Sequence, residues 1–230
     1  MSVRQKVPED LTARKALALE VIDRLKKEYT DAGCTLDYAH AWQLLVSVRL
    51  AAQCTDARVN IVVEDLFAKY PSVAALAAAE PEDIEAIVKP CGLGHSKARD
   101  ISACMRMLRD KYDCQVPATF EELLALPGVG RKSANLIMGD VFGKPAIVTD
   151  THCIRLCNRI GLVDGIKEPQ KVEMALWKII PPEEGSDLCH RFVMHGRAVC
   201  NARKPECEHC CLKAICRYAQ EQSDTQTAGS

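Results

Sequence analysis

A five-residue turn, Leu-Pro-Gly-Val-Gly at positions 126–130, constrains the fold of this chain most strongly. Before it, the spacing of Thr119 and Glu122 predicts a capping box that opens a short helix. After it, residues 131–142 have a helical pattern that ends before Gly143. The sequence therefore predicts two helices joined by a tight hairpin that contains two glycines.

The same hairpin is a candidate anion-binding site. Gly128 and Gly130 allow positive φ and a close approach of the backbone to a bulky ligand. A turn that leads into a helix N-terminus also leaves backbone N–H groups unpaired. These groups and the helix dipole favour an anion such as a phosphate. Because Gly-x-Gly turns before helices are common, a purely structural turn is the alternative.

Two charged residues make this region a candidate active site. Lys132 lies in the first predicted turn of the second helix, where the dipole and any burial would disfavour its charged form. A neutral lysine amine can act as a nucleophile that forms Schiff bases. Asp150 precedes the next helical pattern, and an ionised carboxylate there could accept a proton or stabilise a developing cation. The structural alternatives are a solvated surface lysine and an aspartate that only caps a helix.

Four cysteines near the C-terminus form a second candidate site, with the spacing Cys200-x6-Cys207-x2-Cys210-x5-Cys216. The chain has 13 cysteines, an odd number, and neither a signal peptide nor an apolar run long enough to span a membrane. These features predict reduced thiols and a cytoplasmic location, nucleoid-associated in a bacterium. Four thiolates this close indicate a metal site. On spacing alone, a zinc site and an iron–sulfur cluster are both open.

Charge is unevenly distributed along the chain. The formal net charge of −1 argues weakly against a nucleic-acid binder. A local basic face can nevertheless bind phosphates while the whole protein stays near neutral. Such a face is predicted from Arg191, Arg197, Arg203, Lys204, Lys213 and Arg217, which outnumber Glu206 and Glu208 in the same segment. Arg203 and Lys204 lie between the cysteines and are candidate phosphate contacts, with a solvated loop as the alternative.

The pattern along the whole chain predicts an all-α fold. Hydrophobic residues make up 48% of the chain and aromatic residues only 5%, so the core is aliphatic and rich in alanine, which suits helices. Only residues 146–149 have an extended pattern. The polar tail at 219–230 is predicted to be disordered. Further helical patterns occupy residues 11–29, 40–52, 57–70, 72–79, 81–88 and 96–112.

The segments LPGVGRKSAN and VTDTHCIRLCNRIGL resemble the helix-hairpin-helix and catalytic-aspartate region of the endonuclease III family of DNA glycosylases. The resemblance extends from about Leu44 to Cys216. It implies two helical lobes with bent DNA in the cleft between them. One is a six-helix lobe at 34–144 with the helix-hairpin-helix at about 119–142. The other is discontinuous, from 1–33 and 145–218, and carries a cluster loop at 200–216.

The resemblance also implies an activity, that of a base-excision-repair DNA glycosylase with AP lyase activity. Lys132 would attack the sugar of a damaged nucleotide and form a Schiff base, with Asp150 supporting it, and β-elimination would then cut the strand. Gly128 and Gly130 would anchor a backbone phosphate. The implied partner is double-stranded DNA containing oxidised pyrimidines or abasic sites. A monomer is the simplest assumption.

Two further residues and the cofactor follow from the resemblance. Gln53 and Leu93 would fill the gap left by an extruded nucleotide, whose extrusion costs a few kcal/mol. The sequence by itself favours a buried or capping amide for Gln53, and it shows Leu93 only as one leucine in a glycine-rich turn. Relatives often carry bulkier or amide residues after that leucine, whereas this chain has Gly94 and His95. The cysteine spacing is that of the family's cluster loop and implies a [4Fe–4S] cluster.

Other functions are compatible with parts of the sequence. The adenine-glycosylase branch shares the hairpin and the cluster, but it lacks a lysine at the position of Lys132 and carries a further C-terminal domain. A non-catalytic helix-hairpin-helix DNA-binding module would use the hairpin alone, and Lys132 and Asp150 both count against it. A mismatch or other-lesion glycosylase of the same superfamily also remains open. A ferredoxin-like electron carrier would explain the cysteines but no other part of the chain.

Overall fold

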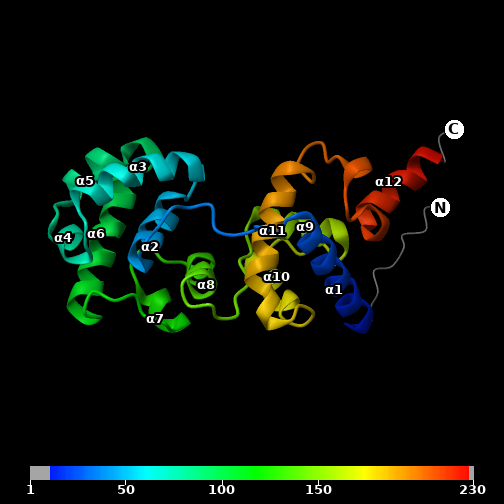
Figure 1. Ribbon diagram of the computed structural model, residues 1–230, viewed down its shortest axis with the longest axis horizontal. Coiled ribbons are helices and arrows are strands. Elements are labelled where there is room, and N and C mark those ends of the chain that lie inside the picture. Colours follow the sequence, from blue (N-terminus) through cyan, green and yellow to red (C-terminus); the bar gives the residue numbers. More distant parts are fainter. Residues whose placement is uncertain (1–10, 228–230) are drawn as a thin grey trace. The chain divides into compact units, whose positions relative to one another are not determined.

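The computed structural model describes residues 11–227, with side chains to residue 223. Every regular element in this part of the chain is a helix, as Figure 1 shows, which confirms the predicted all-α class. The chain divides into two compact units. We call Cys34–Lys144 the hairpin unit, and Met1–Gly33 together with Pro145–Ser230 the cysteine-loop unit. Each unit is described by itself.

The hairpin unit is built around its longest helix, α6. Helices α4 and α5 pack against α6, and α2 also contacts it (Figure 1). Leu44, Met105 and Leu108 are fully buried in the aliphatic core that results. The elements of this unit are α2 (Ala41–Leu50), α3 (Asp56–Lys69), α4 (Val73–Ala78), α5 (Pro81–Val88), η1 (Lys89–Cys91), α6 (Gly94–Lys111), α7 (Phe120–Ala125) and α8 (Arg131–Asp140).

Local sequence signals explain where several of these helices begin. The hydroxyl of Thr55 accepts a hydrogen bond from the backbone N–H of Arg58 and caps α3. The Thr119 hydroxyl accepts from the backbone N–H of Glu122 at 3.3 Å and caps α7, as predicted. Proline at the first position of α5 fits a site where no N–H donor is needed. These local signals fix where each helix begins, independently of packing in the core.

The cysteine-loop unit is centred on α9 and α11, which pack against each other. Helix α1 also packs on α11, and the Tyr29 hydroxyl lies 2.9 Å from Nδ1 of the buried His195. The elements of this unit are α1 (Leu11–Glu28), α9 (Thr151–Ile160), α10 (Pro169–Leu176), η2 (Pro182–Glu184), α11 (Gly185–Ala198), η3 (Cys207–His209), η4 (Lys213–Ile215) and α12 (Arg217–Thr227).

The C-terminal tail differs from the prediction. The sequence predicted disorder from residue 219, but α12 extends to Thr227, and only residues 228–230 of that tail lie outside the described residues. The first turn explains the difference, because Arg217 donates to the carbonyl of Asn158 at 2.6 Å and pairs with Asp164 at 2.7 Å. Ala219 is buried as well. Anchoring by one arginine and one small apolar residue is easily missed in a segment of polar composition.

The segment that follows the hairpin unit is irregular. Residues 146–149 form no strand, although Ala146, Ile147 and Val148 are buried.

Among the helices that the structure describes, none is both long enough and apolar enough to cross a membrane.

Candidate functional site

The hairpin at residues 126–130 is tight, as its sequence predicted. The backbone N–H of Val129 donates to the carbonyl of Leu126 at 3.1 Å and closes the turn. Gly128 has a φ of +76°, and a Cβ at this position would lie 2.8 Å from Cβ of Asp100. Glycine is therefore required at position 128 both by the backbone conformation and by the space available.

Gly130 does not use the positive φ that the sequence suggested for both glycines. Its φ is −96° and its ψ is 176°, an extended conformation that any residue adopts. The reason is its place as the N-cap of α8, where extended backbone is the rule. A Cβ at this exposed position would meet no protein atom within 4 Å. The fold itself therefore does not demand a glycine at position 130.

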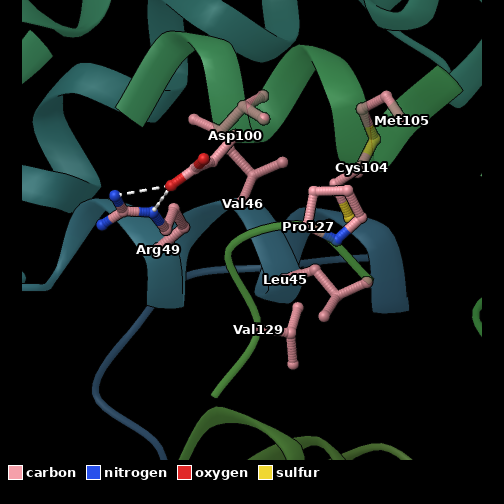
Figure 2. Close-up of a pocket in the computed structure, with 9 residues that line it drawn as sticks. Leu45, Val46, Arg49, Asp100, Cys104, Met105, Pro127 and Val129 are labelled. Atoms are coloured by element: carbon pink, nitrogen blue, oxygen red, sulfur yellow. Dashed lines mark hydrogen bonds and ion pairs between the residues drawn. The ribbon is translucent and has the colours of Figure 1, made fainter. Parts of the chain in front are cut away.

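The hairpin lies on a seat formed by α2 and α6. Figure 2 shows Pro127 and Val129 beside Leu45 of α2 and Met105 of α6. The space between them is only about 10 Å³, the least that could hold one water molecule. At the edge of the seat Arg49 of α2 and Asp100 of α6 form an ion pair at 2.7 Å, and Arg49 also donates to the Ser96 hydroxyl. The turn is thus positioned by close packing and one ion pair.

Lys132 is the second residue of α8, directly after the hairpin. Its side chain is exposed, so the burial considered from sequence is not present. No side chain caps this helix and no acidic residue lies in its first turn. The neighbouring Arg131 is directed elsewhere, with its guanidinium 4.9 Å from the centre of the Phe120 ring. The exposed N-terminus of α8 therefore presents backbone N–H groups and one lysine amine together.

Asp150 is the N-cap of α9, in the cysteine-loop unit. Its Oδ1 accepts a hydrogen bond from the backbone N–H of Cys153 at 2.7 Å, and its side chain is half-buried. The capping interpretation of Asp150 is confirmed, and it occupies only one of the two carboxylate oxygens. Cys153 and Cys189 are buried next to it, and hydrogen bonding to neighbouring thiols, together with burial, raises the pKa of both well above the usual range. These cysteines behave as small buried hydrophobes, as predicted.

Gln53 and Leu93 share two features that the sequence does not reveal. Both have a left-handed backbone, with φ of +60° and +50°, which is rare for residues with a side chain. Both are exposed, Leu93 to 59%. Gln53 is therefore not a buried amide, and Thr55 rather than Gln53 caps α3. Leu93 is the N-cap of α6.

The four spaced cysteines lie on a loop that two arginines of α9 hold by its backbone. Arg159 donates to the carbonyls of Asn201 at 2.8 Å and Ala202 at 2.9 Å, and its Nη1 lies 3.3 Å from Sγ of Cys200. Arg155 donates to the carbonyl of Cys200 at 2.9 Å. Because α9 is a rigid helix, these bonds fix where the loop begins.

The thiols of this loop lie close enough to influence one another. Burial raises the pKa of Cys207, and the neighbouring Cys210 and Cys200 raise it further. Burial raises the pKa of Cys216 to about 11, and the same two neighbours contribute. Sγ of Cys210 lies 3.3 Å from Nε2 of the buried His195. Cys200 thus lies against one arginine and Cys210 against one histidine.

This donor set fits an iron–sulfur cluster, since such clusters are held by four cysteine thiolates. Nearby hydrogen-bond donors to sulfur, which Arg159 supplies at Cys200, are typical surroundings of such clusters. As the described residues stand, no three His, Cys, Asp or Glu side chains are arranged to hold a metal ion. The fit therefore rests on the number and gathering of the thiols.

The predicted basic face is smaller than the sequence suggested. Arg191 is buried and donates to the carbonyl of Tyr29, Lys213 pairs with Glu208 at 2.6 Å, and Arg217 is held by Asp164. Arg203 and Lys204 are exposed on the cysteine loop. The backbone N–H of Lys204 donates to the side chain of Asn201 at 2.8 Å and tightens the turn there.

Some residues of the site were not found from sequence. Arg155 and Arg159 are four residues apart, a spacing that places them on one helix face, but their partners are carbonyls about 40 residues away. His195 gave no signal beyond being one of the two histidines in its helix. Lys97 is fully buried although its helix is rich in charge.

Comparisons with known proteins agree with this geometry. Residues 46–182 match the model of the HhH-GPD superfamily of base excision DNA repair proteins. Endonuclease III of Synechocystis sp. is 43% identical over 91% of this chain and 96% of its own length. Endonuclease III of Escherichia coli K12 is 37% identical over 90% of this chain and 98% of its own. A solved structure of a trapped endonuclease III–DNA covalent intermediate superposes with a TM-score of 0.86, at 40% identity over 91% of this chain and 98% of that one.

The helical fold, the hairpin and the superfamily match together define the class, a helix-hairpin-helix protein of base excision DNA repair. Within that class the chain belongs to the endonuclease III family, because members from distant bacteria match it over nearly its whole length.

Proposed function

We propose that the chain is a DNA glycosylase with AP lyase activity that removes oxidised pyrimidines from duplex DNA and also cleaves at abasic sites. The observation that carries the proposal is the exposed Lys132 amine on the first turn of α8, directly after the Gly128 hairpin. An exposed lysine amine, a helix N-terminus and an endonuclease III sequence coincide at this point. DNA is the partner, and in a bacterium this places the protein at the nucleoid.

The hairpin would hold the DNA backbone. The uncapped N-terminus of α8 offers N–H groups to a phosphate, and the helix dipole favours the same charge. Gly130 leaves space for a phosphate to approach, since no protein atom lies within 4 Å of where its Cβ would be. The seat on α2 and α6 keeps these donors fixed in direction. Arg203 and Lys204 would add phosphate contacts from the cysteine loop.

The chemistry begins at the sugar of the damaged nucleotide. The Asp150 carboxylate accepts a proton from the Lys132 ammonium, and the neutral amine attacks C1′. The bond between C1′ and the base nitrogen breaks, and its electron pair leaves with the base, which takes up a proton. Asp150 passes its proton on to the leaving base, and the carboxylate that results stabilises the positive charge on the sugar. The proposal requires both side chains, supplied by a single monomeric chain, to act on one nucleotide.

Strand cleavage follows from the same covalent bond. Loss of the second amine proton and opening of the sugar ring give a Schiff base between Lys132 and C1′. Removal of a proton from C2′ then expels the 3′ phosphate by β-elimination, so the strand is cut on its 3′ side. Water hydrolyses the Schiff base and returns the free amine. No step changes an oxidation state.

We also propose a [4Fe–4S] cluster on Cys200, Cys207, Cys210 and Cys216. Bound there, it would supply iron–sulfur bonds that stabilise the loop carrying Arg203 and Lys204, and the reaction would not pass through it. Arg159 and His195 contact two of these sulfurs and would keep the loop oriented. Iron, acid-labile sulfide and zinc measured in the purified protein decide between a cluster and the zinc alternative.

Borohydride trapping tests the proposed reaction. A duplex with one thymine glycol is incubated with wild type, Lys132→Ala and Lys111→Ala, the last a control at an exposed lysine of the same unit. A covalent adduct in wild type and Lys111→Ala but not in Lys132→Ala is expected. Base loss without an adduct in wild type would leave a monofunctional glycosylase. Binding without base loss or adduct would leave another lesion or a non-catalytic DNA-binding module.

A further inference from the structure

Lys97 is the one fully buried lysine among the described residues, and it has no part in the chemistry proposed above. Its side chain is 0% exposed, and burying a charge is unfavourable unless it is hydrogen-bonded. The ammonium donates to the carbonyl of Leu50 at 2.9 Å and to the carbonyl of Cys91 at 2.8 Å. Burial lowers the pKa of Lys97 from its ordinary value. Because burial of this charge is unfavourable, its two hydrogen bonds must offset that cost and so stabilise the surrounding fold.

The two acceptors belong to different loops. Leu50 is the last residue of α2 and leads into the turn that contains Gln53. Cys91 is the last residue of η1 and leads into the turn that contains Leu93. The backbone N–H of Lys97 also donates to the carbonyl of Leu93 at 3.0 Å. One lysine therefore touches both loops, although they lie about 40 residues apart in the sequence.

The same two loops contain strained backbone. Gln53 and Leu93 both have positive φ, a conformation that persists in a residue with a side chain only when its surroundings enforce it. The two loops are also close at Cys54 and Cys91, because burial raises the pKa of the Cys91 thiol to about 11 and the neighbouring Cys54 raises it further. The buried ammonium is thus bonded to both loops that contain a strained residue with an exposed side chain.

We propose that Lys97 is a positioning residue that clamps the Gln53 and Leu93 loops together, so that the two exposed side chains enter the DNA duplex as a pair. This inference rests on the proposed function, in which Gln53 and Leu93 fill the gap left by the extruded nucleotide. Lysine suits the task because its ammonium has three donors and no acceptor, which matches two loops that both present carbonyls. The clamp exists before DNA binds, so little ordering remains for the moment of extrusion.

The first experiment separates extrusion from chemistry. Lys97→Met keeps the length of the side chain and removes its donors. Wild type and variant are compared on thymine glycol paired with adenine in a duplex, and on thymine glycol already unpaired in a single-nucleotide bulge. We expect kcat/KM to fall at least about tenfold on the paired lesion, because extrusion costs a few kcal/mol, and to change less than about twofold on the bulge.

A matched control removes the effect of lowered stability. Leu108→Ala truncates another fully buried residue of α6 that contacts neither loop carbonyl through its side chain. It should reduce activity on both substrates by one common factor. An equal loss on both substrates for Lys97→Met, or no loss on either, would overturn the proposal.

Hydrogen exchange without DNA tests the clamp apart from the enzyme activity. In Lys97→Met the amides of residues 51–55 and 89–95 should exchange faster together, while the C-terminal half of α6 keeps its protection. If wild type cleaves no lesion, the proposed function fails, yet this measurement still judges the clamp. If Lys97→Met does not fold, hydrogen exchange of the wild type in low denaturant is measured instead. Opening of both loops in one step supports the clamp, and two independent openings reject it.

Discussion

The hairpin and the cysteine loop are held by different physical forces. The hairpin lies on apolar side chains of two helices, with Gly128 fitted against Asp100 and almost no empty space beneath Pro127 and Val129. The backbone of the cysteine loop is instead held by hydrogen bonds from Arg155 and Arg159. The comparison teaches that close packing, with one ion pair at its edge, can fix a short turn. A loop of this length instead needs charge, backbone bonds and, in our proposal, a cluster.

The largest loss of stability is expected when Arg159 is replaced, because the cysteine loop depends on this one side chain. Arg159→Met removes the bonds to the carbonyls of Asn201 and Ala202 and the contact with Cys200. Leaving these acceptors unpaired should cost about 3–5 kcal/mol in the free energy of unfolding and lower the iron content of the purified protein. Urea unfolding and iron analysis measure both. Arg99→Met, at an exposed arginine of the hairpin unit, is the control, and a loss below about 1 kcal/mol at Arg159 would contradict the comparison.

The hairpin should respond to space instead of charge. Gly128→Ala forces a side chain into a left-handed conformation and against Asp100, which should cost about 2–4 kcal/mol. Gly130→Ala has an ordinary φ and open space around the new Cβ, so only the poorer N-cap propensity of alanine counts and stability should change by less than about 1 kcal/mol. Thermal unfolding of the two variants checks the pair. DNA affinity should nevertheless fall in Gly130→Ala if a phosphate approaches there, and unchanged affinity would remove Gly130 from the interface.

The hairpin seat contains a buried thiol, Cys104, that should make the free energy of unfolding fall in alkaline solution. Burial raises the pKa of Cys104, in the hairpin seat, to about 12, so its folded-state pKa lies above the unfolded value. Its contribution to stability is complete below about pH 8.5 and is lost as pH rises toward 12, by about 1.4 kcal/mol per pH unit, because only the unfolded thiol ionises. Cys104→Ala should flatten this decline in urea unfolding between pH 8 and 10. An identical decline in the variant would show that other groups cause it.

The smallest effect concerns a single phosphate contact of the cysteine loop. Lys204→Ala should reduce the slope of log K against log salt concentration by about one unit. Lys178→Ala, at another exposed lysine of the same unit, should leave that slope unchanged. Fluorescence anisotropy with a labelled abasic-site duplex measures both. Equal slopes for Lys204→Ala and wild type would return Lys204 to a solvated loop residue.

Much of the fold follows from local sequence signals. Thr55, Thr119 and Pro81 mark helix N-termini, and the structure begins helices there because the caps act over one turn. The hairpin and Asp150 were predicted for the same reason. The class of protein followed from resemblance, which the superfamily match confirms.

Long-range contacts explain what the sequence did not reveal. The basic face was overestimated because Arg191, Lys213 and Arg217 find partners inside the unit, and net charge cannot show such pairing. The tail was predicted to be disordered because its anchor, Asp164, lies 53 residues from Arg217 in the chain. Lys97 reads as one more charge on a polar helix until its distant carbonyl acceptors are known. These features need a structure, since only folding brings the partners together.

The attachment of α1 has a consequence for how the chain folds as it is synthesised. The buried face of α1, including Val21 and Leu25, packs in a unit whose other helices begin at Thr151. At about 5–20 residues per second, its partner helix α11 emerges from the ribosome roughly 10–40 seconds after α1 does. The hairpin unit can be completed in the interval. During translation the apolar face of α1 therefore stays uncovered until the helices that begin at Thr151 have been made.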